Sequence, residues 1–231
     1  GSASAASHPV WNVGGTVENS YWTKYFGAIR RCAMFLKYAD PEVIGSATDY
    51  NRWCAEAHLL RAYYYSELLA WFGCGLPIID EPYSYTDDFS EVERASYYDV
   101  VQYIISECDK ALASNDLPWR ITSSGEAYRV NKALAWGIKS RMSMFAASPL
   151  YNTDESGATI HPNAWKEAYE INKAAISALE AQGWGLYSKI NQAATFDGDN
   201  TCLDDWNGNP KGITKGAKIY SEYFNQSMAW T

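Results

Sequence analysis

One uninterrupted stretch, residues 49–77, limits what this chain can fold into more than any other. It runs for 24 residues without Gly or Pro and then contains Gly73, Gly75 and Pro77 in quick succession. Because Gly accepts the left-handed conformation that ends many helices and Pro cannot continue one, the stretch predicts a long helix with an abrupt end. Apolar side chains recur along it at helical spacing: Trp53, Ala57, Leu60, Tyr64, Leu68 and Trp71.

The same stretch is apolar nearly all the way round. Its three successive tyrosines, residues 63–65, point about 100° apart and wrap ring surface around the helix. We therefore expect other helices to pack on more than one side of it. Arg61 is the charged exception. We expect it, for structural reasons, to pair with a carboxylate, with Glu56 and Glu67 as the local candidates, or to donate to nearby carbonyls.

The apolar period continues beyond this stretch. It predicts four more helices, at residues 21–38, 96–114, 128–148 and 164–182. Pro41 ends the first, because the residue before a Pro resists the helical conformation. Ser96 and Asp99 have the spacing of a capping box. Asn163 is expected to cap the last helix and Gly183 to end it.

A helix–loop–helix order with a wide apolar face on every helix is typical of tetratricopeptide-like repeats, which bury those faces by stacking. The predicted fold class is all-α: stacked helix pairs of degenerate tetratricopeptide-like repeats with long irregular loops. The expected domains are an N-terminal loop or arm at residues 1–19, a helical-repeat domain at 20–187, and an irregular segment at 188–231 that leads into a further C-terminal part.

Composition excludes several functional classes. A formal net charge of −8 argues against nucleic acid or an anionic membrane as a direct partner, since both bind through clustered Lys and Arg. The five Cys are not closely paired, which is neither a disulfide framework nor a zinc pattern. We expect no cofactor. The 18 Tyr and 10 Trp serve either a ring-rich core or flat surfaces on which sugars stack.

Two acidic clusters deserve a chemical interpretation. The first contains Asp197, Asp199, Asp204 and Asp205. Counted from its first Asp, an EF-hand would need Gly at position six and Glu at position twelve, where this chain has Cys202 and Gly208. A solvated acidic loop is therefore favoured over a calcium site.

The second cluster follows the long helix. Its members are Asp80, Glu81, Asp87 and Asp88, the acids best placed to form the facing pair that hydrolyses glycosides. With 27 acids in the chain, some lie close together by chance, and we expect no catalytic pair. The three histidines, His8, His58 and His161, are too far apart to form a known metal motif.

Residues 55–79 resemble the signature helix of the SusD/RagB family of surface nutrient-binding lipoproteins. The matching residues are Glu56, Ala57, Leu60, Arg61, Ala62, Tyr63, Tyr64, Tyr65, Leu68, Phe72, Gly73 and Pro77. The other helices between residues 21 and 187 resemble the family's elements in the same order. Ala33 stands where the family often has Asn, and Cys108 where it has Leu.

This resemblance implies a function. Family members are longer outer-membrane, surface-exposed lipoproteins that capture oligosaccharides or polysaccharides without cleaving them and without a cofactor. They form a lid on a SusC-like TonB-dependent transporter. By this resemblance we expect no enzymatic activity, and we expect a lipid anchor that this chain does not carry.

In the family, loops outside the repeats contact the sugar. The predicted carbohydrate-binding residues are therefore rings on loops, with one amide: Trp11, Asn12, Tyr83, Tyr85 and Trp119. Two alternatives have other chemistry. One is a helical-repeat scaffold that binds a protein partner, and the other is an α-helical carbohydrate-active enzyme.

Overall fold

The computed structural model describes residues 16–73, 75–84, 86–90 and 92–185, and side chains from residue 21 onward. Its helices are α1 (Thr16–Tyr38), α2 (Pro41–Ile44), α3 (Ala47–Phe72), α4 (Tyr97–Ala113), α5 (Lys132–Ala147) and α6 (Ala164–Ala181), with a 3-10 turn at Ser124–Glu126. The described residues contain no strand, only an isolated bridge between Thr153 and Thr159. The all-α prediction is confirmed.

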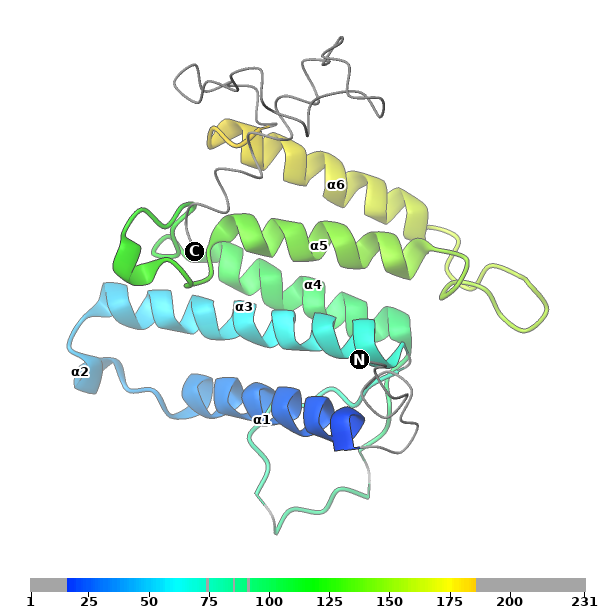
Figure 1. Ribbon diagram of the computed structural model, residues 1–231, viewed down its shortest axis with the longest axis horizontal. Coiled ribbons are helices and arrows are strands. Elements are labelled where there is room, and N and C mark those ends of the chain that lie inside the picture. The colour runs from blue at the N-terminus through cyan, green and yellow to red at the C-terminus, as the bar shows by residue number, and fades with distance from the viewer. Residues whose placement is uncertain (1–15, 74, 85, 91, 186–231) are drawn as a thin grey trace, which may run out of the picture. The chain divides into compact units, whose positions relative to one another are not determined.

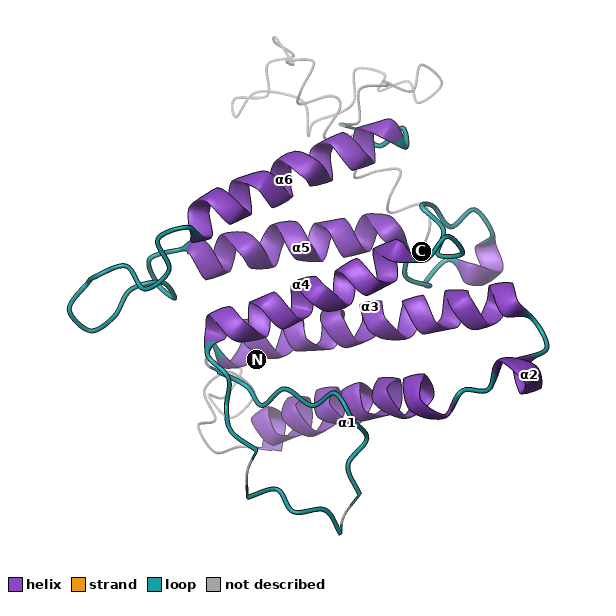
Figure 2. Ribbon diagram, turned by 180° about the vertical axis from the view of Figure 1, so that it is seen from behind, coloured by secondary structure: helices purple, strands orange, loops and turns teal. Residues whose placement is uncertain are grey.

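The chain divides into two units, residues 1–178 and 179–231. The second is described only over residues 179–185, so the packing below is that of the first. Within it, α3 lies between α1 and α4, and α5 packs against α4 (Figures 1 and 2). Successive long helices run antiparallel, as expected for stacked helix pairs.

Local signals fix both ends of α3. The Ser46 hydroxyl accepts the backbone N–H of Asp49 at 3.2 Å and so caps the first turn. Gly73 ends the helix in the left-handed conformation, with φ 59°, and donates its N–H to the carbonyl of Leu69. Two residues later, a Cβ on Gly75 would lie 2.0 Å from the carbonyl oxygen of Ala95. The abrupt end predicted from Gly and Pro is confirmed.

The core lies where α3 meets its neighbours. Most of its α3 side chains follow one helical line, Ala55, Leu59, Ala62, Tyr65 and Leu69, all at most 3% exposed, and the fully buried Leu68 of the predicted stripe joins them. The line predicted from sequence is displaced from this one, and Trp53 and Trp71 at its ends remain 38% and 53% exposed. Because α3 is apolar nearly all round, its periodicity does not specify which side faces the larger neighbour.

Two helix starts differ from the sequence prediction. α1 begins at Thr16 rather than residue 21, so the prediction of a loop is wrong for residues 16–19. Apolar periodicity marks only the part of a helix that packs against a neighbour. The backbone of α1 is helical for a further, polar first turn before that part begins. α5 begins at Lys132 rather than residue 128, because the Asn131 side chain accepts the N–H of Leu134 at 3.0 Å and caps the helix there.

The cap of α4 and the limits of α6 follow the sequence more closely. The Ser96 hydroxyl accepts the N–H of Asp99 at 3.1 Å and donates to its carboxylate at 2.6 Å, which is the predicted pairing of cap and third residue. α6 begins directly after Asn163, and Gly183 follows its end with φ 71°. α6 buries only alanines, at positions 164, 168 and 175.

Candidate functional site

The predicted loop residues fall into two groups. Trp11, Asn12 and Tyr85 lie outside the described residues, as does the acidic loop at residues 197–205. Tyr83 lies in the segment between α3 and α4, where its carbonyl accepts Arg30 Nε of α1 at 3.1 Å and its ring lies 5.2 Å from that of Phe89.

Trp119 lies on the other long connection, between α4 and α5. The ammonium of Lys132 lies 5.8 Å from the centre of its ring. Trp119 therefore lies at the start of α5 and Tyr83 lies against α1. These contacts of the two residues have no partner residue in common.

A buried ionic network ties the segment after α3 to the helices. Glu107 of α4 is fully buried, and its carboxylate accepts bonds from Arg61 Nε at 2.7 Å, His58 Nδ1 at 2.9 Å and Lys110 Nζ at 2.7 Å. Burial alone would raise the pKa of Glu107, but these hydrogen bonds outweigh it and lower the pKa to about 2. Arg61 also donates to the carbonyl of Asp80 at 3.1 Å.

The partner predicted for Arg61 is therefore wrong. Glu56 and Glu67 lie five and six positions from Arg61, which puts them about 120–140° away around the helix. Arg61 points instead at α4, where Glu107 provides its carboxylate. Glu56 pairs with Arg129, at 2.6 Å. The sequence of a helix shows which of its residues share a face, but it does not show which charged residues lie opposite them on the neighbouring helix.

The four acids after α3 serve local contacts. Asp80 accepts the hydroxyl of Tyr103, and Glu81 pairs with Lys37 of α1 at 2.7 Å. The other two shape turns: Asp87 accepts the N–H of Ser84 at 2.6 Å, and Asp88 accepts that of Ser90 at 2.9 Å. Each of the four carboxylates therefore has a local hydrogen-bond or ion-pair partner.

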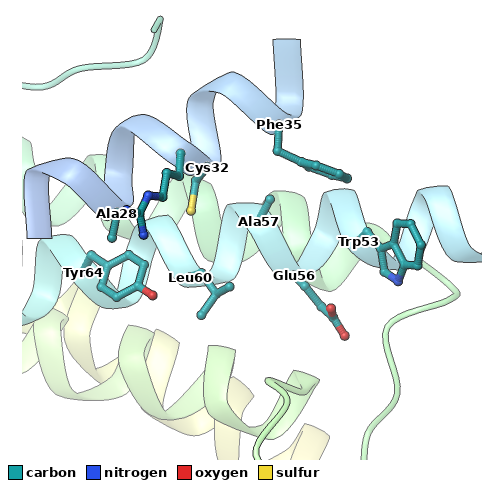
Figure 3. A pocket seen from close by; sticks show the side chains of 9 residues that line it. Ala28, Cys32, Phe35, Trp53, Glu56, Ala57, Leu60 and Tyr64 are labelled. Carbon is teal, nitrogen blue, oxygen red and sulfur yellow. The ribbon is translucent and has the colours of Figure 1, made fainter. Parts of the chain in front are cut away.

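A hollow with ring-lined walls lies between α1 and α3 and has a volume of about 320 Å³ (Figure 3). α1 contributes Ala28, Arg31, Cys32 and Phe35, and α3 contributes Trp53, Glu56, Ala57, Leu60 and Tyr64. The small alanine side chains of the two helices leave space between the helices, and the larger side chains surround that space. We call this surface the α1–α3 groove.

The groove combines apolar walls with fixed charges. Glu56, which is 13% exposed at its side chain, accepts bonds from Arg52 at 3.1 Å and Arg129 at 2.6 Å, so its carboxylate is held in place. Arg31 supplies the positive group from α1. Aromatic walls with a few oriented polar groups are the usual composition of a ligand site.

The thiol that lines the groove, Cys32, is not activated as a nucleophile. Burial raises the pKa of the Cys32 thiol to about 11, so this sulfur is neutral near neutral pH and a poor nucleophile. In the part of the chain that the structure describes, no group of three or more His, Cys, Asp or Glu residues is arranged to hold a metal ion. The arrangement is suited to binding.

A row of rings continues from the groove to the end of α3. Tyr64 lies 6.0 Å from Tyr25, Tyr25 lies 6.0 Å from Tyr21, and Tyr21 stacks on Trp71 at 4.6 Å with 16° between the ring planes. Tyr63 adjoins Tyr64 at 5.7 Å. We call these five rings the aromatic row. None of them belongs to the fully buried core.

The groove and the aromatic row form one extended face. From Trp53 to Trp71 the face spans 18 residues of α3, or about 27 Å along the helix. By sequence, both tryptophans share one apolar stripe, and the rings of the chain serve either the core or a sugar-stacking surface. The stripe itself does not separate these roles, since it also carries Leu68, which is fully buried.

Residues 2–144 match the model of a SusD-like family described as starch-binding and associating with the outer membrane. That match covers more than half of the chain. The chain belongs to this SusD-like family. None of the curated proteins matches it.

Solved SusD-like structures share the fold. A SusD-like carbohydrate-binding protein from Bacteroides fragilis is 20% identical, with a TM-score of 0.55 over 76% of this chain and 29% of that one. Surface glycan-binding protein A from Bacteroides uniformis is 21% identical, with a TM-score of 0.55 over 74% and 33%. A laminarin-binding SusD-like protein is 20% identical, with a TM-score of 0.54 over 75% and 31%.

At these sequence identities, the likeness to the solved structures shows a shared fold. The chain spans about a third of the length of the solved structures it matches. Among the helices that are described, none has the length and hydropathy needed to cross a membrane.

Proposed function

We propose that this chain is the helical-repeat part of a surface protein that captures oligosaccharides or polysaccharides without cleaving them. The observation that carries the proposal is the continuous aromatic face of α1 and α3, formed by the groove and the aromatic row. Family membership supports it, because the family is described as starch-binding. Rings that stay partly exposed along about 27 Å offer stacking positions for several successive sugar residues.

The wider setting is also a proposal. We propose that the full protein is a surface-exposed outer-membrane lipoprotein, held by a lipid anchor, and that it delivers the glycan to a SusC-like TonB-dependent transporter. The family description, with its association with the outer membrane, supports the location. The stacked helices also offer broad faces on which a protein partner can dock.

The loop residues remain part of the proposed glycan contacts. Trp11, Asn12, Tyr83, Tyr85 and Trp119 would act from the connections, and the α1–α3 face would act from the helices. Replacing Trp11, Tyr83 and Tyr85 by Ala in one triple variant tests whether these loop residues contact the glycan. Unchanged glycan affinity in that triple variant, measured in the intact protein, would reject it.

The function is tested by isothermal titration calorimetry of the chain against starch, laminarin and a panel of plant, host and microbial polysaccharides. We expect micromolar binding of at least one glycan, with no release of reducing ends after prolonged incubation. Release of reducing ends would instead favour a carbohydrate-active enzyme. Absence of binding to every glycan, together with capture of a transporter or peptide, would favour a protein-binding scaffold.

Substitutions then test whether the α1–α3 face is the site. We expect Trp53→Ala and Tyr64→Ala each to weaken binding by more than about fivefold, since a central aromatic contact contributes more than about 1 kcal/mol. Trp165→Ala is the matched control, because Trp165 of α6 is 54% exposed and lies outside the groove. Equal effects of all three substitutions would refute the assignment of the site.

A further inference from the structure

A second, smaller cavity lies at the end of the first unit opposite to the 3-10 turn. Here the end of α3, the start of α4 and the end of α5 come together (Figures 1 and 2). The cavity has a volume of about 180 Å³, and its walls include Leu69, Tyr97, Arg141, Met142, Phe145 and Tyr151. We call it the Arg141 pocket. It shares no lining residue with the α1–α3 groove.

One wall of the pocket is a preformed aromatic surface. The rings of Tyr97 and Tyr151 stack with 3.7 Å between their centres and 6° between their planes. This stack joins the first turn of α4 to the connection after α5, so two separate elements hold it in place. Both tyrosines are half-buried, and their hydroxyls can donate or accept hydrogen bonds at the pocket wall.

The charge in the pocket comes from Arg141. Its guanidinium carbon lies 5.6 Å from the centre of the Phe145 ring. A cation at this distance is attracted to the ring face, and the guanidinium offers five N–H donors in a planar fork. Arg141 also lies near enough to Tyr97 to oppose the rise in the pKa of that hydroxyl, which burial and Tyr151 cause.

Arg141 differs from the paired arginines of the chain. Arg52, Arg61 and Arg129 each lie within 4.0 Å of a carboxylate. No ion pair of the described residues includes Arg141, and no acidic residue lines its pocket. The α1–α3 groove, by comparison, is lined by the acidic Glu56 as well as by Arg31. In a chain of net charge −8, a cationic pocket without an acid is suited to an anionic ligand.

The size of the pocket limits that ligand to a small group. At about 180 Å³ it is smaller than the roughly 300–1,000 Å³ of typical ligand pockets and suited to a single sugar residue. We infer that the Arg141 pocket binds one anionic sugar residue of a glycan, whose carboxylate or sulfate receives the Arg141 guanidinium while the sugar ring packs on the neighbouring aromatic side chains. This inference rests on the proposed glycan-binding function and adds the class of sugar.

The test compares ligands that differ only in charge. The intact chain is titrated with short oligogalacturonates and with the same oligosaccharides after complete methyl esterification, which removes the carboxylate charge. Sulfated carrageenan oligosaccharides and their desulfated forms make the corresponding pair for a sulfate group. We expect one charged ligand to bind about 10- to 100-fold more tightly than its neutral form, the range for a hydrogen bond to a charged group.

Variants assign that preference to one residue. Arg141→Gln should abolish the preference for the charged ligand, and Arg141→Lys should keep part of it, because Lys retains the charge and loses the planar fork. Arg94→Gln removes the same charge from an exposed position that lines neither the α1–α3 groove nor the Arg141 pocket, and it should leave the preference unchanged. Thermal unfolding of each variant checks that it is folded.

The outcomes separate this inference from the proposed function. Equal affinity for charged and neutral forms, or a preference that survives Arg141→Gln or is lost in Arg94→Gln, overturns the Arg141 pocket as an anionic subsite. Binding of neutral glycans alone also overturns it and leaves the proposed function standing. Failure to bind any glycan in the panel refutes the proposed function, and this inference with it.

Discussion

Replacing Glu107 with Gln removes the central charge of the buried network while keeping the shape of the side chain. The pKa of Glu107 is about 2, against an ordinary value of 4.5. At 1.36 kcal/mol per pH unit, this difference corresponds to about 3 kcal/mol of stability that depends on the ionised carboxylate. Because its side chain is fully buried, solvent screens little of that energy.

The direction of the pH dependence follows from the lowered pKa. The stabilisation is complete above pH 4.5, where the carboxylate is ionised in both the folded and the unfolded chain. As the pH falls from 4.5 towards 2, the unfolded chain takes up a proton that the folded chain excludes, and the stabilisation is lost. The Gln variant has no such proton to bind at this position.

Urea unfolding, followed by tryptophan fluorescence between neutral pH and about pH 3, measures both effects. At neutral pH we expect Glu107→Gln to lower the free energy of unfolding by roughly 3–5 kcal/mol, because Arg61 is left buried without its carboxylate. The gap between wild type and variant should narrow as the pH falls below 4.5. Other carboxylates titrate in the same range, and taking this difference cancels their contribution.

Glu81→Gln provides the control. Glu81 forms an ion pair with Lys37 at 2.7 Å, but their side chains are 66% and 47% exposed. Solvent screens such a pair, so this substitution should leave the free energy of unfolding nearly unchanged at every pH. A Glu107→Gln variant as stable as the wild type, or a gap that stays constant into acid, would refute the reasoning.

Three further substitutions or reactions test the fold. Gly75→Ala should destabilise the chain and separate α3 from α4, because the new Cβ would lie 2.0 Å from the Ala95 carbonyl oxygen; a raised thermal midpoint would contradict this. Tyr65→Phe should lower the free energy of unfolding in urea by about 1–3 kcal/mol, because the buried hydroxyl accepts the N–H of Ile79 at 2.8 Å and donates to the carbonyl of Pro77 at 3.2 Å. An unchanged free energy of unfolding would reject this anchoring role. Burial raises the thiol pKa values of Cys32 and Cys108 to about 11 and about 12, so both should resist iodoacetamide at pH 8 until urea unfolds the chain. Peptide mass mapping measures the labelling, and rapid labelling of either thiol in the folded chain would contradict their burial.

The sequence predicted the parts of the fold that depend on neighbouring residues along the chain. Gly73 ends α3 because Gly adopts φ 59° without strain, and Ser96 starts α4 through a bond to a residue three positions away. The family resemblance extended these local signals to a repeat architecture. The order of five long helices followed from the same apolar periods.

The site was harder to predict, because it depends on which faces meet in space. Trp71 fits a helical stripe and is nevertheless 53% exposed, since α1 covers one face of its ring through Tyr21 and leaves the rest open. Glu107 looks like one polar position in an amphipathic helix until Arg61 of α3 is placed opposite it. Neither contact has a signature along the chain.

The central claim is that glycans bind along the aromatic face of α1 and α3. Indole N–H resonances of the isotope-labelled chain, assigned by single Trp→Phe substitutions and titrated with a glycan that calorimetry shows to bind, test it most directly. We predict that the signals of Trp53 and Trp71 shift in a saturable way while that of Trp165 on α6 stays in place. Saturable binding that leaves Trp53 and Trp71 unmoved would contradict the claim.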